Sequence, residues 1–275
     1  MNKVWLITGA NSGFGRAITE AAVAAGDIAV ATARRVASLD DLAAGHPGQV
    51  DVLPLDVTDA TAIDATVRDI IARHDRIDVL VNNAGRTHVG AVEETTDAEL
   101  RDLFEVHVFG PAALTRAVLP HMRSRRSGAI VAISSMGGQL SFAGFGAYSA
   151  TKSALEGMSE ALADEVSPLG IKVLIVEPGA FRTGLFGSHS ASTPIPDYAG
   201  TAGRTRQLIE TSAGAQPGDP AKAAAAILTA LDAPDTPLRL PLGDDAVDAI
   251  LGHLDSVRGD IRTWEKLARD TQLDG

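Results

Sequence analysis

Short apolar stretches alternate with amphipathic segments along most of the chain. Six stretches have the length of buried strands and cover residues 4–8, 28–33, 50–55, 79–81, 129–134 and 172–176. Between them, apolar residues recur at helical spacing over residues 16–23, 62–74, 97–122 and 148–162, and Gly110-Pro111 is expected to bend the third of these helices. A further helix is expected over residues 221–231, a seventh strand over 238–242 and a mostly helical segment over 246–268. This alternation predicts an α/β fold with a doubly wound parallel sheet of about seven strands and helices on both faces.

Composition narrows the class of protein. Of the 275 residues, 45% are hydrophobic but only 4% aromatic, so the core must consist mainly of aliphatic side chains packed on a buried sheet. The net charge of −11 argues against nucleic acid or an anionic membrane as a partner. The chain has no cysteine, which excludes disulfides, thiolate catalysis and Cys-ligated zinc, and we expect no metal site. Without a signal peptide or an apolar run of membrane-spanning length, we expect a soluble, cytoplasmic protein.

A glycine-rich turn follows the first strand and precedes the first helix. Residues 8–15 read TGANSGFG, and glycines at such a turn let the backbone approach a pyrophosphate, while the helix N-terminus offers N–H donors. A tight turn that needs glycine only for its dihedral angles is the simpler alternative. In the strand–turn–helix context, the turn favours a nucleotide-binding Rossmann fold, and we expect a single domain over residues 1–275.

Polar residues at the next two strand ends indicate how a dinucleotide would be held. Arg34 and Arg35 follow the second strand with no acid before Asp40, which favours the 2′-phosphate of NADP(H) over the ribose hydroxyl of NAD(H); a solvated loop charge is the alternative. Asp56 and Val57 end the third strand and suit the adenine ring, although Asp56 could instead cap the helix that begins near Thr61.

A phenol and an ammonium group stand four residues apart at Tyr148 and Lys152, on one face if the segment is helical. A nearby cation favours the phenolate and makes tyrosine a usable acid and base. Like the glycine turn and Arg34, the other polar strand ends, namely Asn83, Ser135 and Pro178-Gly179, fall at the carboxyl edge of the predicted sheet, where such folds bind ligands.

In their order and spacing, these motifs resemble the short-chain dehydrogenase/reductase family over essentially the whole chain. The matching motifs are Thr8-Gly9-x-x-x-Gly13-x-Gly15, Asn82-Asn83-Ala84-Gly85, Ser135 thirteen residues before Tyr148, Tyr148-x-x-x-Lys152 and Pro178-Gly179. The sequence around Phe14 and Phe145 resembles the branch of the family that contains steroid- and retinol-type reductases. The resemblance implies a homodimer or homotetramer, since the family commonly forms these.

The resemblance also implies a role for each site residue. Tyr148 would be the general acid and base, Lys152 would lower its pKa, and Ser135 would stabilise the substrate oxygen. NADP(H), with NAD(H) possible, would be held by Gly9, Asn11, Ser12, Gly13, Phe14, Gly15, Arg34, Arg35, Asp56, Val57, Asn83, Ala84, Gly85, Tyr148, Lys152, Pro178, Gly179 and Thr183.

One position departs from the family pattern. His107 stands where the family usually has the asparagine of a catalytic tetrad. Either it is a tolerated replacement that acts through its backbone carbonyl at a helix kink, or it titrates within the proton relay, because the pKa of histidine lies near physiological pH.

We therefore expect an NADP(H)-preferring oxidoreductase that interconverts a carbonyl group and an alcohol. Apolar residues suggest an apolar substrate unless they belong to the core; they are Met136, Leu140, Phe142, Phe145, Phe181, Leu185 and Phe186. Residues 180–220 lose regularity and are expected to form a substrate loop or merely a surface loop. A catalytically silent nucleotide sensor would not need the acid/base pair. A sugar-nucleotide epimerase would need a differently spaced glycine turn and a larger C-terminal domain.

Overall fold

Seven parallel strands form one sheet in the computed structural model, which describes residues 2–212 and 214–273. The sheet order is β3-β2-β1-β4-β6-β7-β9, so the chain builds outward from β1 in one direction and then from β4 in the other. This order confirms the predicted doubly wound sheet. The strand bounds are β1 Val4–Thr8, β2 Ile28–Ala33, β3 Val50–Pro54, β4 Val79–Asn82, β6 Gly128–Ile133, β7 Ile171–Pro178 and β9 Arg239–Leu242.

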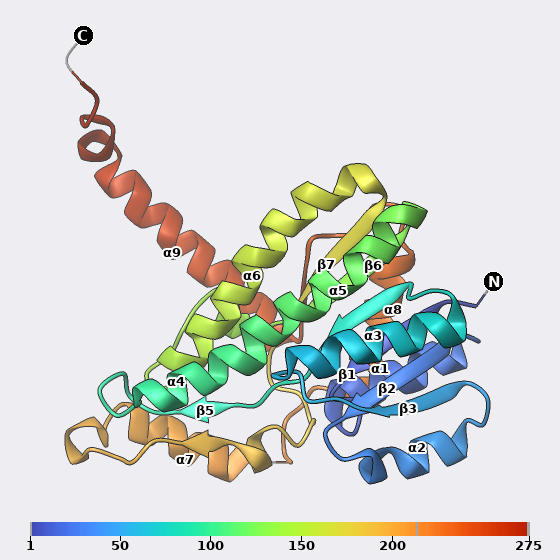
Figure 1. Ribbon diagram of the computed structural model, residues 1–275. Helices are drawn as coiled ribbons and strands as arrows, with labels where there is room; N and C mark the ends of the chain where they lie inside the picture. The colour runs from blue at the N-terminus through green and yellow to red at the C-terminus, as the bar shows by residue number, and fades with distance from the viewer. Residues whose placement is uncertain (1, 213, 274–275) are drawn as a thin grey trace.

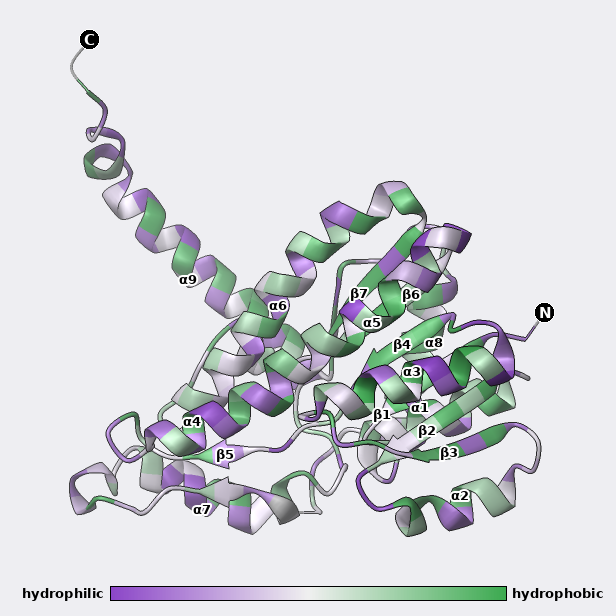
Figure 2. Cartoon of the chain, viewed as in Figure 1, coloured by the Kyte–Doolittle hydropathy of each residue, from purple (hydrophilic) through white to green (hydrophobic). Residues whose placement is uncertain are grey.

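Helices cover both faces of the sheet (Figure 1). Side chains of β1 alternate between two cores: Trp5 and Ile7 pack toward α1 and α8, whereas Val4 and Leu6 pack toward α3 and α5. The helix bounds are α1 Gly13–Ala24, α2 Asp40–Gly45, α3 Ala60–His74, α4 Asp97–Phe104, α5 Gly110–Arg125, α6 Gly146–Val166, α7 Ala202–Ser212, α8 Pro220–Asp232 and α9 Asp244–Arg269. Figure 2 shows the central strands as largely hydrophobic, as a sheet covered on both faces requires.

Two regions of regular structure differ in detail from the expectation. The helix expected over residues 97–122 is a continuous run that contains a π-helical turn at Glu105–Phe109, between α4 and α5. This turn lies directly before Gly110-Pro111, and the Gly110 N–H donates to the Glu105 carbonyl. Residues 180–220 are more regular than expected. They contain α7 and the short strand β8 (Ser190–Ala191), which pairs in parallel with β5 (His88–Val89).

The last helix, α9, leaves the rest of the molecule after its first turns and projects outward (Figure 1). Of its residues, only Ala246 and Ile250 are buried. Within the described ranges, no helix is both long enough and apolar enough to cross a membrane.

Candidate active site

A cavity of about 1080 Å³ opens along the carboxyl ends of the strands. It collects nearly all the residues that the sequence predicted for the site, namely Gly9, Asn11, Ser12, Gly13, Phe14, Arg34, Asp56, Val57, Asn83, Ala84, Gly85, His107, Ser135, Met136, Phe142, Phe145, Tyr148, Lys152, Pro178, Gly179, Phe181, Thr183, Leu185 and Phe186. Three of the described residues that were predicted for it, Gly15, Arg35 and Leu140, do not line it.

The glycine turn brings the backbone close to the cavity. Gly9 and Gly13 have φ angles of 64° and 54°, in the region that side chains other than glycine rarely adopt. Gly15 has a packing role instead, because a Cβ there would lie 2.4 Å from the carbonyl oxygen of Gly9. Ser12 precedes α1 without a capping hydrogen bond, so the first N–H groups of α1 are available to an anion. The turn therefore fits the pyrophosphate of a dinucleotide.

Asn83 fixes this turn to the end of β4. Its side-chain amide donates to the carbonyl oxygens of Thr8 at 2.8 Å and Gly9 at 3.2 Å. The backbone N–H groups of Asn83 and Ala84 both donate to the hydroxyl of Thr8. These bonds hold the floor of the cavity in one shape.

Arg34 and Asp56 lie at the end of the cavity formed by β2 and β3. Asp56 accepts hydrogen bonds from the backbone N–H and hydroxyl of Thr58, which together with the Arg34 charge lower the pKa of the carboxyl. The alternative that Asp56 caps α3 was wrong: Asp59 caps it, accepting from the N–H groups of Thr61 and Ala62. Arg35 precedes a 3₁₀ turn, and its carbonyl accepts from Ser38. Unlike Arg34, Arg35 does not line the cavity.

Tyr148 and Lys152 occupy one face of α6, as the spacing predicted. Both are buried, and the Lys152 ammonium lies 5.7 Å from the centroid of the Tyr148 ring and donates to the Ile133 carbonyl at 2.8 Å. Burial raises the pKa of Tyr148 to about 12, and a hydrogen bond with Ser135 offsets only part of that increase. Burial also lowers the pKa of Lys152 to about 8. In the chain alone, desolvation is the largest influence on the phenol, so the lowering of its pKa by Lys152 stays a prediction for the enzyme with bound cofactor.

His107 is held as a neutral ring directly behind Tyr148. The two rings meet edge to face with their centroids 5.7 Å apart. The Thr151 hydroxyl donates to the Tyr148 carbonyl, so it accepts from His107 Nδ1 at 2.8 Å, while Nε2 accepts from the Arg86 backbone N–H. Burial, reinforced by the Lys152 charge, lowers the pKa of His107 well below its ordinary value. This lowered pKa favours the alternative that His107 is a tolerated replacement over titration within the proton relay.

A buried acidic pair stands behind Lys152, and the sequence interpretation missed it. Glu156 follows Lys152 by one helical turn and accepts from the Ser134 hydroxyl at 2.5 Å. Gln139 bridges Glu156 and Glu177 with 2.9 Å bonds to each, and Arg239 lies 3.3 Å from Glu177. Burial and the neighbouring Glu177 carboxylate raise the pKa of Glu156. The four-residue spacing after Lys152 was a signal that could have revealed Glu156.

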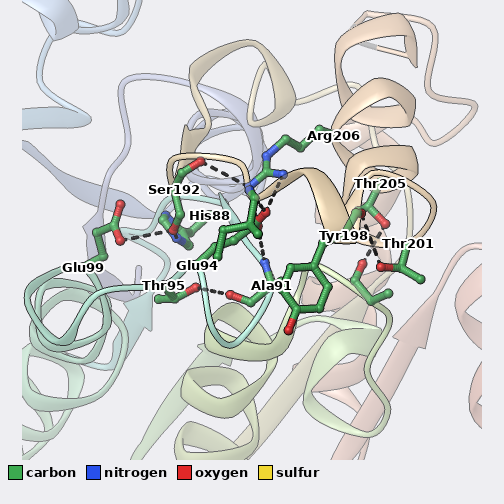
Figure 3. Close-up of polar contacts among 12 residues, drawn as sticks. His88, Ala91, Glu94, Thr95, Glu99, Ser192, Tyr198, Thr201, Thr205 and Arg206 are labelled. Atoms are coloured by element: carbon green, nitrogen blue, oxygen red, sulfur yellow. Dashed lines mark hydrogen bonds and ion pairs between the residues drawn. The ribbon is translucent and has the colours of Figure 1, made fainter.

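On the side away from the cofactor residues, α7 closes the cavity with Thr205, Leu208, Ile209 and Ser212. A buried ion pair anchors α7: Arg206 lies 2.6 Å from Glu94, which also accepts from the backbone N–H groups of Ala91 and Ile195 at 2.7 Å each. Figure 3 shows Arg206 reaching down to Glu94 and to the Ser192 carbonyl. The hydrogen bond from Arg206, together with those from the Ile195 and Ala91 backbone N–H groups, lowers the pKa of Glu94 to about 2, against the opposing effect of burial. The segment after β7 is therefore tied to the loop after β5.

Comparison with known proteins agrees with this geometry. The family model for the short chain dehydrogenases matches residues 3–193. The chain is 35% identical over 271 residues to the oxidoreductase BOA17 of Botryotinia fuckeliana, covering 98% of both chains. It is 39% identical over 211 residues to a 3-ketodihydrosphingosine reductase of Bacteroides thetaiotaomicron, covering 76% of each.

Solved structures agree as well. A short-chain dehydrogenase from Streptomyces avermitilis superposes with a TM-score of 0.94 at 66% identity, covering 98% of both chains. A metagenomic short-chain oxidoreductase in complex with NADP superposes with a TM-score of 0.68 at 28% identity, covering 87% of this chain and 96% of that one. The chain thus belongs to the short-chain dehydrogenase/reductase family and is an NAD(P)-dependent oxidoreductase.

Proposed function

We propose that the protein is an NADPH-dependent reductase of apolar ketones or aldehydes, with residues 180–220 forming the substrate-binding segment of a single-domain enzyme. The observation that carries this proposal is the convergence of Ser135, Tyr148 and Lys152 in the same cavity as the glycine turn and Arg34. A nucleotide sensor needs the turn, but it has no use for a buried phenol beside an ammonium group.

The state of the phenol favours reduction over oxidation. With a pKa of about 12, Tyr148 is protonated at neutral pH and is ready to donate a proton to a substrate oxygen. Ser135 hydrogen-bonds to Tyr148, so a carbonyl oxygen placed between the two hydroxyl groups would accept from both as negative charge develops on it. When bound, the reduced nicotinamide supplies the hydride.

Lys152 has two tasks in this scheme. Its ammonium group donates to the Ile133 carbonyl and would bind the nicotinamide ribose, and its positive charge would stabilise the phenolate that remains after proton transfer. The free energy of forming a phenolate is lower beside a cation than in buried surroundings without one. Lys152 would therefore lower the barrier for proton transfer.

Arg34 supports a preference for NADPH. Its guanidinium lies at the cavity end formed by β2 and β3, where a dinucleotide fold places the adenosine ribose, and it suits a 2′-phosphate. Asp56 and Val57 beside it would hold the adenine. A relative at 28% identity is in complex with NADP, while a 3-ketoacyl-(acyl-carrier-protein) reductase from Brucella melitensis at 25% identity is in complex with NADH. We therefore infer the cofactor preference from the residues of this chain.

The apolar lining supports the substrate class. Phe142, Phe145 and Phe186 face the cavity together with Leu208 from α7. The reductase from Bacteroides is named for a 3-keto sphingoid base, a long-chain ketone, which is consistent with an apolar chain beside the reacting carbonyl.

Tyr148→Phe separates the enzyme from a silent sensor. The substitution removes one oxygen from a buried ring, so we expect NADPH binding, followed by fluorescence titration, to stay within a factor of about two. Turnover should fall by about 10²–10⁴-fold, the usual contribution of a general acid. Unchanged turnover would remove Tyr148 from the mechanism. A wild-type protein that binds NADPH and reduces no carbonyl would favour the sensor.

A further inference from the structure

The projecting helix α9 exposes an apolar face. From Leu254 to Arg269 every residue is exposed, over a length of about 24 Å at 1.5 Å per residue. Among the exposed side chains, Ile261 and Trp264 have 63% and 62% of their surface accessible. In Figure 2, hydrophobic and hydrophilic residues are interspersed along this part of the helix. Exposure of large apolar side chains on this scale indicates an interaction surface.

The apolar positions of α9 follow a strict pattern. One row of apolar residues recurs at alternating intervals of three and four, at Val247, Ile250, Leu254, Val257, Ile261, Trp264 and Ala268. Ile250 is buried in the chain's own fold, and the exposed Leu251 and Leu267 flank the row. Such an alternation over three heptads is typical of the seam of a coiled coil. Gly252 and Gly259 fall on the opposite side of the helix, where a Cβ would meet nothing within 4 Å.

Without a partner, the outer part of α9 has little to support it. Helices in proteins gain most of their stability from packing of an apolar face, and isolated helices of this length are marginal in water. The two glycines weaken this helix further relative to alanine. A second surface over the seam would supply the missing stabilisation.

The charges along α9 indicate what that second surface is. The half up to Val257 has no lysine or arginine and four acids, Asp244, Asp245, Asp248 and Asp255. The half from Arg258 onward has four basic residues against Asp260 and Glu265, namely Arg258, Arg262, Lys266 and Arg269. A second α9 running antiparallel would place its basic half against the acidic half of the first, whereas a parallel pair would place like charges together.

We propose that two copies of this chain pair antiparallel through α9, with the exposed seam positions between Val247 and Ala268 as an isologous interface. The pairing also reaches the edge of the active site. The carboxylate of Asp245, in the first turn of α9, accepts from the backbone N–H of Ala180 at 2.7 Å and lines the cavity. Pairing of α9 therefore steadies a wall of the site.

Adjacent substitutions on and off the seam test the interface. Val257→Glu places a charge on the seam, while Ser256→Glu places the same charge on the neighbouring, off-seam position; both residues are exposed, so neither change disturbs the core. By sedimentation equilibrium, we expect Val257→Glu to halve the mass of the assembly and Ser256→Glu to keep the wild-type mass. Circular dichroism and NADPH binding check that both variants fold. Equal masses for wild type and Val257→Glu, or a monomeric wild type, would overturn the proposal.

Spin labels test the direction of the pairing, and the absence of cysteine gives each variant a single labelling site. For an antiparallel pair, electron–electron distances between copies should be short at Ser256→Cys, near the middle of the seam, and about 30–40 Å at Arg269→Cys, near its end. Short distances at both positions would show a parallel pair and overturn the charge argument.

Discussion

Burial decides the protonation of the ionisable side chains at the centre of the site. It raises the pKa of Tyr148 to about 12, lowers that of Lys152 to about 8 and lowers that of His107 well below its ordinary value. In each case the low-polarity surroundings disfavour the charged form. At neutral pH the site therefore holds a protonated phenol, a mostly charged ammonium group and a neutral imidazole, which suits proton donation to a carbonyl.

A pH–rate comparison of wild type and His107→Asn follows from this state. Because His107 stays neutral, the profiles of kcat/KM for carbonyl reduction should superimpose between pH 6 and 8. Both should fall as pH rises through about 8, where Lys152 loses its proton. Loss of hydrogen bonds to Thr151 and Arg86 should still lower the melting temperature of the variant. An inflection near pH 6.5 that is present only in wild type would restore His107 to the relay.

At the scale of elements, the strands and the polar residues at their ends could be predicted from the sequence, whereas the wall of the substrate pocket could not. A buried parallel strand is marked by a short apolar run, and its carboxyl end fixes where Arg34, Asp56, Asn83 and Ser135 must gather. The substrate side depends on contacts between distant segments. Glu94 and Arg206 lie 112 residues apart, and no local pattern marks such a pair.

The π-helical turn illustrates the same limit. Gly110-Pro111 marks the place of an irregularity in the sequence, but its form, a π-helical turn over the five residues before it, has no local pattern. The chain also approaches another segment closely here: a Cβ on Gly110 would lie 2.4 Å from the Val57 carbonyl oxygen. Only the tertiary structure contains that contact.

The buried pair of Glu94 and Arg206 gives α7 its place, so breaking it should affect the substrate more than the cofactor. Glu94→Gln leaves the Arg206 cation without its partner charge, a change that typically costs about 3–5 kcal/mol of stability. We expect a lower melting temperature and a raised KM for the carbonyl, with the affinity for NADPH unchanged. Arg204→Gln, on the exposed side of the same helix, serves as the control.

This effect should depend on pH in one direction. The pKa of Glu94 is lowered to about 2 from its ordinary 4.5, so its contribution to stability is complete above pH 4.5 and is lost as pH falls toward 2. The difference in melting temperature between wild type and Glu94→Gln should shrink over that range. A difference that is constant with pH, or a KM unchanged from wild type, would show that the ion pair does not position α7.

At the scale of the whole molecule, the net negative charge opposes the binding of an anionic cofactor. The chain has a net charge of −11, so its overall field repels NADPH, and attraction must come from local groups. In our proposal, the backbone N–H groups of the glycine turn bind the pyrophosphate and Arg34 supplies the cation for the 2′-phosphate. Arg35, although adjacent in sequence, does not line the cavity, so the two arginines form a natural matched pair.

The most direct test is cofactor selectivity in carbonyl reduction, measured as kcat/KM with NADPH and NADH on a panel of apolar ketones and aldehydes. Wild type should prefer NADPH. Arg34→Ala should lose about tenfold to a hundredfold with NADPH, as expected for a hydrogen bond to a charged group worth about 1.5–3 kcal/mol, and nothing with NADH. Arg35→Ala should behave as wild type. Equal or better use of NADH by the wild-type enzyme, or no reduction of any carbonyl despite cofactor binding, would contradict the account.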